Sequence, residues 1–277
     1  MIAVEPLTDW NLGMSDVDNA RWQSDLDLIA EAARRAGAVA LSHFNQSPEV
    51  WWKNEGRSPV SAADFAANEI LETILRTARP DYGWLSEETE DSADRLSRDT
   101  LFIIDPIDGT RGFLAGQKLW CVSVAVVHKG RPVAGVLNAP ALDELYEAVA
   151  GGIALKNGLP IRVSEPKRPV RFAIAEDVLN GFKEPLRGSI ERVKHVPSLA
   201  YRVAMVADAA IDGTFVKRNS HDWDLAAADL ILERAGGRLV NLDGTALTYN
   251  RADVRHGELC AGSEPLLNEF LSPIAAR

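Results

Sequence analysis

The sequence of 277 residues is short of cysteine, of basic charge and of long apolar runs. Its two cysteines, Cys121 and Cys260, form no CxxC pair and no Cys/His cluster with zinc spacing. This excludes a disulfide framework and a sulfur-ligated metal site, and it favours a reducing, cytoplasmic location. Because no apolar run approaches the roughly 20 residues that span a bilayer, we expect no membrane association. The acidic, mixed N-terminus also lacks the basic and apolar regions of a signal peptide.

Acidic residues outnumber basic ones, 40 to 30, which gives a formal net charge of -10. Such a surface repels nucleic-acid backbones and anionic membranes, so nucleic acid is a disfavoured partner. An anionic small substrate would need local positive charge from a metal ion or a lysine. The hydrophobic share of 46% suits a compact globular chain.

Hydrophobic periodicity predicts an α/β fold, an α+β layered sandwich. We expect an N-terminal extension over residues 1–23, an N-terminal α+β subdomain with an antiparallel sheet over 24–165, and a C-terminal α/β subdomain over 166–277. A first helix is predicted to begin at Ser24, with Asp27 as its capping partner.

Two further local signals support this organisation. A second helix should begin at Ser61 and end before Pro80. Short apolar runs between residues 82 and 150 predict an antiparallel sheet, with Lys129-Gly130 as a hairpin turn.

Acidic residues fall at the ends of predicted elements. These are Glu87 and Glu88 after "GWL", Asp105 and Asp108 after "LFII", and Asp224 at the start of a helix. Gathered carboxylates repel one another unless a cation neutralises them. Oxygen ligands without His or Cys suit Mg²⁺ or Mn²⁺. A metal site at these ends is therefore predicted.

Glycine and threonine follow the second aspartate in "DPIDGT". Gly109 lets the backbone approach a ligand closely, and the free N–H groups of a following helical turn attract phosphate oxygens. Metal ligands beside a phosphate cradle indicate phosphate chemistry.

Each of these positions also has a purely structural interpretation. "DPIDG" is typical of a turn, Asp64 could be the acid of a capping box with Ser61, and Asp224 could complement the helix dipole. "SEETED" could be a solvated loop. The order and spacing of all the motifs together favour the functional interpretation.

The segments "PVSAAD", "WLSEE", "DPIDGT" and "WDLAAA" occur in this order. Over about residues 24 to 270 the chain resembles the lithium-sensitive, Mg²⁺-dependent phosphatases of the inositol monophosphatase superfamily. "LSEE" and "DGTRGF" are similar to the CysQ-type 3′(2′),5′-bisphosphate nucleotidase branch. The resemblance implies an αβαβα fold and inhibition by Li⁺.

The resemblance also implies the ligands of two or more Mg²⁺ ions. Glu87, Asp105 and the main-chain carbonyl of Ile107 would hold the first ion. Asp105, Asp108 and Asp224 would hold the second, so that Asp105 bridges the two.

The resemblance further implies the catalytic and phosphate-binding groups. Thr110, oriented by Asp64, would activate a water together with Glu87, and the Gly109 and Thr110 amides would bind phosphate. The chain departs from the family pattern at two positions. Ser61 stands where threonine is usual, and Ala228 replaces a glycine.

A substrate-binding role is predicted for Lys217, seven residues before Asp224. Inositol monophosphatases, by the same resemblance, carry a glutamate there that binds a sugar hydroxyl. A lysine only donates hydrogen bonds and suits a second phosphate. The alternative is a solvated lysine at a strand end.

The predicted function is hydrolysis of a small phosphorylated substrate, first adenosine 3′,5′-bisphosphate to AMP and phosphate. The alternatives are an inositol-1-phosphate or broad sugar-phosphate phosphatase and, in another class, a regulatory partner in a transcription complex. A haloacid dehalogenase mechanism is disfavoured because Pro106, two residues before Asp108, stands where its nucleophilic aspartate would be. A homodimer is among the expected assemblies.

Overall fold

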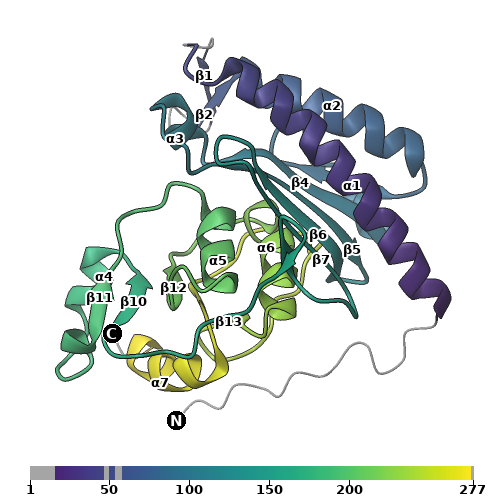
Figure 1. Cartoon of the computed structure of the whole chain (residues 1–277). Coiled ribbons are helices and arrows are strands. Elements are labelled where there is room, and N and C mark those ends of the chain that lie inside the picture. Colours follow the sequence, from purple (N-terminus) through teal and green to yellow (C-terminus); the bar gives the residue numbers. More distant parts are fainter. Residues whose placement is uncertain (1–15, 47–49, 54–57, 276–277) are drawn as a thin grey trace.

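Two β-sheets and the helices on their faces make up the fold, and the computed structural model describes residues 16–46, 50–53 and 58–275 (Figure 1). The layers run helices, seven-stranded sheet, helices, five-stranded sheet, helices, because separate apolar clusters fill the space between successive layers. The expected αβαβα sandwich is confirmed. In addition, the strands β1 (Val50–Lys53) and β2 (Ser58–Ser61) form a small antiparallel ribbon.

The larger sheet has the strand order β3-β4-β5-β6-β7-β8-β9. Only the β3–β4 pair is parallel, so the prediction of an antiparallel sheet is confirmed. Lys129 and Gly130 both have positive φ, 47° and 79°, and form the predicted hairpin between β5 and β6. The strands are β3 (Gly83–Ser86), β4 (Thr100–Asp108), β5 (Cys121–His128), β6 (Arg131–Ala139), β7 (Glu144–Val149), β8 (Leu155–Lys156) and β9 (Leu159–Pro160).

Helices α1 (Asp16–His43) and α2 (Ala62–Ala78) cover one face of this sheet (Figure 1). In β4, Phe102 and Ile104 face these helices, while Leu101 and Ile103 face the opposite core. A strand buried on both faces reads as a continuous apolar run, which explains "LFII". The predicted helix start at Ser24 is wrong. Helix α1 begins at Asp16, within the expected extension, and the Ser24 hydroxyl accepts from the Arg79 guanidinium.

Helices α5 (Leu199–Ala207) and α6 (Asp222–Arg234) lie between the two sheets (Figure 1). A Cβ at Gly135 of β6 would come within 2.9 Å of the Ala227 carbonyl oxygen. Helix α6 therefore packs against the large sheet at backbone distance, which places its first turn beside the end of β4.

The smaller sheet has the order β11-β10-β12-β14-β13. Phe172, Phe215 and Cys260 face the outer helices, whereas Ala261 faces α5 and α6. The remaining elements are β10 (Val170–Ala173), α4 (Glu176–Asn180), β11 (Ile190–Arg192), β12 (Gly213–Val216), β13 (Arg238–Asn241), β14 (Leu259–Gly262), α7 (Glu264–Ala275) and the short 3₁₀ segments Ala93–Ser97 and Arg187–Ser189. Within the described ranges, none of the helices has the length and apolarity that crossing a membrane requires.

Candidate metal centre

A β-bulge at the end of β4 brings Asp105 and Asp108 to the same side of the strand. Asp105 pairs with Ser123 and Asp108 with Cys121, so three steps along β4 oppose two along β5. In a regular strand, residues three apart point to opposite faces. The extra residue of the bulge removes this alternation. The proline of "DPIDGT" thus belongs to a bulged strand end, and only the glycine after Asp108 lies in a turn.

Asp224 reaches the same place from the first turn of α6. One ligand oxygen from each of Asp105, Asp108 and Asp224 lies within 4.8 Å of the others. The Ser123 hydroxyl donates to the Trp223 carbonyl over 3.1 Å and ties α6 to β5. The predicted convergence of these three carboxylates is therefore present.

Backbone donors orient each of the three carboxylates. The amide of Ile107 donates to Asp105 Oδ1 over 3.0 Å, and that of His221 donates to Asp224 Oδ2 over 2.7 Å. Asp108 Oδ2 accepts from the amide of Ala200, in the first turn of α5, at 2.6 Å and from the hydroxyl of Ser198, the N-cap of that helix. These contacts fix one oxygen of each group and direct the carboxylates toward a common point.

Burial and mutual repulsion raise the pKa of two of these acids. Burial, then the charges of Glu87, Asp108 and Asp224, hold the pKa of Asp105 well above its usual range. Burial, then Asp224, raises the pKa of Asp108 to about 7. The site therefore holds more negative charge than the protein itself neutralises. Glu87 and Glu88 act on Asp105 from the loop after β3, where the amide of Glu87 donates to the Ile104 carbonyl over 3.1 Å.

Asp64 makes hydrogen bonds both to the start of α2 and to Thr110. Its Oδ2 accepts from the amide and the hydroxyl of Ser61, which closes the capping box of α2. Its Oδ1 lies 3.2 Å from the Thr110 hydroxyl oxygen, which also lies 3.0 Å from the Ile107 carbonyl oxygen. Ser61 supplies the same hydroxyl that threonine would. Thr110 is thus held between a carboxylate and a carbonyl that is itself an expected ligand.

Gly109 makes the turn from β4 into α3 (Thr110–Leu114) in the left-handed region, with φ 97°. A Cβ there would lie 3.1 to 3.2 Å from the Ser198 backbone and Cβ atoms. Both the conformation and the close packing favour glycine.

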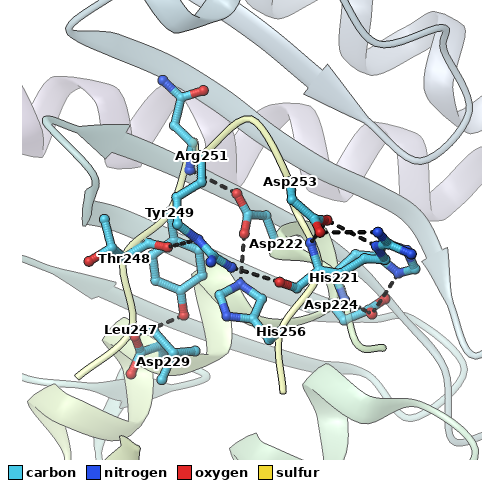
Figure 2. Close-up of polar contacts among 12 residues, drawn as sticks. His221, Asp222, Asp224, Asp229, Leu247, Thr248, Tyr249, Arg251, Asp253 and His256 are labelled. Carbon is cyan, nitrogen blue, oxygen red and sulfur yellow. Dashed lines mark hydrogen bonds and ion pairs between the residues drawn. The ribbon is translucent and has the colours of Figure 1, made fainter. Parts of the chain in front are cut away.

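A second polar network surrounds the start of α6, and sequence analysis missed it. Asp222 and His256 are both buried, and Asp222 Oδ1 lies 2.7 Å from His256 Nε2 (Figure 2). Asp222 Oδ2 accepts from the Asn250 amide over 2.8 Å, and Tyr249 donates to Asp229 of α6 over 2.9 Å. The loop after β13 is thereby fixed to the helix that carries Asp224. Histidine and aspartate 34 residues apart give no local signal.

The predicted substrate residue Lys217 lies at the end of β12 and is exposed. Its Nζ forms an ion pair with Asp177 of α4, with an N–O distance of 2.8 Å. Ser198 was also missed, although as the N-cap of α5 it bonds Asp108. Cys121 and Cys260 are free cysteines buried in the core.

The donor set fits hard divalent cations. It consists of carboxylate and carbonyl oxygens, two of the carboxylates are almost fully buried, and their raised pKa values show uncompensated charge. Asp105, Asp108 and Asp224 would hold the metal, with Glu87 and the Ile107 carbonyl beside them. Charged oxygens in such a geometry are ligands for Mg²⁺ rather than for softer ions.

Comparisons with known proteins agree on the kind of protein. A sequence model described as the inositol monophosphatase family matches residues 22–275. The chain is 34% identical to an inositol-1-monophosphatase of Mesorhizobium japonicum, over 91% of this chain and 98% of that protein. It is 30% identical to Nus factor SuhB of Haemophilus influenzae, over 90% and 95%. The CysQ structure from Bacteroides thetaiotaomicron superposes with a TM-score of 0.75 at 25% identity, over 89% and 99%.

Proposed function

The chain belongs to the inositol monophosphatase family, whose members are phosphatases acting on phosphoric monoesters, and we propose that it hydrolyses a small phosphomonoester with two Mg²⁺ ions at the site described above. The observation that carries this proposal is the convergence of Asp105, Asp108 and Asp224 within 4.8 Å, beside the Thr110–Asp64 pair.

Each part of the site has a role in this reaction. When bound, two divalent cations acidify a water and offset negative charge on the phosphoryl group. The Thr110 hydroxyl donates a hydrogen bond to Asp64 or to the Ile107 carbonyl, which leaves its lone pairs to accept a hydrogen bond from the attacking water and orient it. Glu87, next to Asp105, takes part in activating the water. The amides of Gly109 and Thr110, at the start of α3, would hold phosphate oxygens.

Asp105→Asn tests the proposed centre. A neutral amide is a poorer ligand for Mg²⁺, and the bridging charge is lost from both ions. We expect turnover to fall by more than a hundredfold while the circular dichroism spectrum stays that of the wild type. Because the substitution removes repulsion among buried acids, the metal-free variant should unfold at an equal or higher urea concentration. Activity within tenfold of wild type at saturating Mg²⁺ would contradict the two-metal site.

Adenosine 3′,5′-bisphosphate is the first substrate that we propose, as in the CysQ branch. Inositol-1-phosphate is the second candidate, supported by the name of the relative from Mesorhizobium japonicum. Phosphate release with Mg²⁺ from both compounds and from sugar phosphates decides between them. Millimolar Li⁺ should inhibit, because its single charge is a poor substitute at the second site. No release from any compound in the panel would contradict the proposed activity.

Lys217 is proposed to attract the second phosphate. Lys217→Glu should raise KM for adenosine 3′,5′-bisphosphate at least tenfold more than KM for adenosine 3′-monophosphate, since attraction becomes repulsion. Asp177→Asn is the control, because it releases Lys217 from its ion pair without changing the lysine. Equal changes for both substrates would remove Lys217 from the binding site.

A regulatory role in transcription is the alternative in another class, and the name of the relative from Haemophilus influenzae favours it. It predicts capture of transcription proteins by wild type and Asp105→Asn alike, since such binding does not need turnover. A cytoplasmic location and a homodimer complete the proposal, and cell fractionation and sedimentation test them.

A further inference from the structure

Arg95 is a buried arginine in the 3₁₀ segment Ala93–Ser97, between the acidic loop after β3 and the start of β4. It is 2% exposed, and Arg238 is the only other buried lysine or arginine among the side chains that the structure describes. Long cationic side chains are almost never fully buried unless they are paired. The burial of Arg95 therefore points to a specific set of partners.

On one side, Arg95 holds the acidic loop "SEETED", which carries Glu87 and Glu88. Its Nε and Nη2 donate to the two carboxylate oxygens of Asp91, the last acid of this loop, over 2.6 and 2.8 Å. A bidentate pair of this kind is stronger than a single contact and fixes the relative orientation of the two groups. The loop is thus tied to a buried side chain and is not a plain solvated segment.

On its other side, Arg95 holds the loop after β13. Its Nη1 donates to Asn250 Oδ1 over 2.7 Å and to the Arg251 carbonyl over 3.0 Å, and the Asn250 side-chain amide donates back to the Arg95 carbonyl over 3.2 Å. The main-chain amide of Asn250 in turn donates to Asp222 in the first turn of α6 (Figure 2). Asp224 lies two residues further along that helix.

Arg95 therefore connects two parts of the chain that both contribute to the metal centre. Asp105 and Asp108 lie at the end of β4 with Glu87 acting on Asp105, whereas Asp224 belongs to α6. Repulsion among these carboxylates acts to separate the two parts when no cation is bound. A planar guanidinium with hydrogen bonds to both loops opposes that separation and fixes their distance, which a flexible lysine does less well.

We propose that Arg95 is a positioning residue for the metal centre. It sets the position of the loop that carries Glu87 and Glu88 relative to the first turn of α6, and it thereby raises the affinity for Mg²⁺. This role rests on the proposed function and adds to it a residue that touches neither the substrate nor the metal. It acts through Asp91 on one side and through Asn250 and Asp222 on the other.

Arg95→Met tests the role, because methionine retains an unbranched apolar stem and leaves the Asp91 carboxylate, whose side chain is 44% exposed, to the solvent. Calorimetric titration of Mg²⁺ into the metal-free variant should give a dissociation constant about tenfold higher than that of the wild type. The Mg²⁺ concentration for half-maximal turnover should rise by the same factor. At saturating Mg²⁺, kcat should stay close to that of the wild type, because no group that contacts the substrate is removed.

Two further variants and one control complete the set. Arg95→Lys keeps the charge without the planar fork and should fall between wild type and Arg95→Met. Asp91→Asn weakens the bidentate pair from its more exposed side and should also raise the dissociation constant for Mg²⁺. Arg76→Met is the matched control, because Arg76 forms an ion pair with Glu72 four residues away, in the last turn of α2, and should bind Mg²⁺ as the wild type does.

A purely structural role gives a different result. Arg95→Met would then lower the free energy of unfolding in EDTA and leave the dissociation constant for Mg²⁺ unchanged, and this result would overturn the proposal. If Arg95→Met does not fold, unchanged Mg²⁺ affinity in both Arg95→Lys and Asp91→Asn overturns it instead. The titration needs no turnover, so a wild type that binds Mg²⁺ but hydrolyses no phosphomonoester would contradict the proposed function alone. A wild type that binds Mg²⁺ no more tightly than Asp105→Asn would overturn both.

Discussion

Single residues at this site take part in structure and chemistry together. Asp64 uses one oxygen to cap α2 and the other to accept from Thr110. A capping box fixes the rotamer of its acid, so the cap also sets the position of the oxygen that faces Thr110. The structural interpretation of this aspartate is confirmed, and the functional one stays a prediction that the structure allows, because the two oxygens are independent acceptors.

Gly109→Ala tests how closely the turn after β4 is packed. The alanine Cβ would meet Ser198 at 3.1 Å, in a backbone conformation with φ 97° that disfavours any side chain. We expect a loss of about 1–2 kcal/mol from the left-handed conformation alone. The close contact should also displace Ser198 and Asp108. We therefore expect a further loss of stability and a fall in kcat/KM of at least tenfold. Urea unfolding and phosphate release measure the two effects.

Gly158→Ala is the matched control for this substitution. Gly158 also has positive φ, 76°, but a Cβ there would meet nothing within 4 Å. The two variants share the conformational strain and differ in packing and in proximity to the site. If both lose the same stability and neither loses activity, close packing at Gly109 has no role in the site.

Sequence analysis predicted the elements whose signals are local. The run "LFII" predicted a buried strand, Ser61 predicted the start of α2, and Lys129-Gly130 predicted a hairpin, because each depends on residues that are neighbours in the chain. The family motifs predicted the acidic cluster. The start of α1 was misplaced, since the helix continues to Asp16 beyond the most regular part of its periodicity.

The remaining parts of the site depend on residues far apart in the sequence. Ser198 bonds Asp108 across 90 positions, and Asp222 and His256 are 34 apart. No local period or spacing encodes such pairs, because layer packing alone brings them together.

At the scale of elements, the Asp222–His256 pair should stabilise the start of α6. Removing one partner leaves the other buried with fewer hydrogen bonds, which costs about 1–3 kcal/mol. His256→Ala should lower the free energy of unfolding by this amount and weaken Mg²⁺ binding, since Asp224 lies on the same helical turn. His195→Ala, which removes an exposed histidine, should do neither.

Urea unfolding of His256→Ala, Asp222→Asn and the double variant completes the test. Residues in contact show a coupling energy in a double-mutant cycle, whereas independent residues add. We expect the double variant to lose less unfolding free energy than the sum of the losses in the two single variants. Additive losses would show that the loop after β13 is held to α6 by other contacts.

At the scale of the whole molecule, the metal centre joins parts that a shared core already unites. Asp105 and Asp108 come from the large sheet and Asp224 from α6, and one apolar cluster includes residues of both sheets and of α5 and α6. The two expected subdomains should therefore unfold together. Mg²⁺ should shift the midpoint of this single transition upward and raise the free energy of unfolding by about 2.7 kcal/mol at a concentration 100 times its dissociation constant.

The pH dependence of the metal-free protein has a defined sign. The pKa of Asp108 is raised from 3.8 to about 7 in the folded state, mainly by burial. The unfolded chain loses this proton near its ordinary pKa of about 3.9. Between about pH 4 and pH 7 the folded state therefore binds more protons. Its stability is fully present below this window and decreases as pH rises through it, by up to about 1.4 kcal/mol per pH unit for one proton.

Asp108→Asn removes this contribution together with the repulsion that the Asp108 charge exerts on Asp105. The difference in unfolding free energy between wild type and variant, measured in EDTA from pH 4 to pH 8, should shift against the wild type with rising pH and level off above about pH 7. In saturating Mg²⁺ the dependence of this free-energy difference on pH should reverse its sign, because the metal displaces the proton and binds more tightly at higher pH. If the difference stays constant across this range in EDTA, then Asp108 is ionised in the metal-free fold. Another group, such as one of the donors from α5, would then neutralise the buried carboxylate.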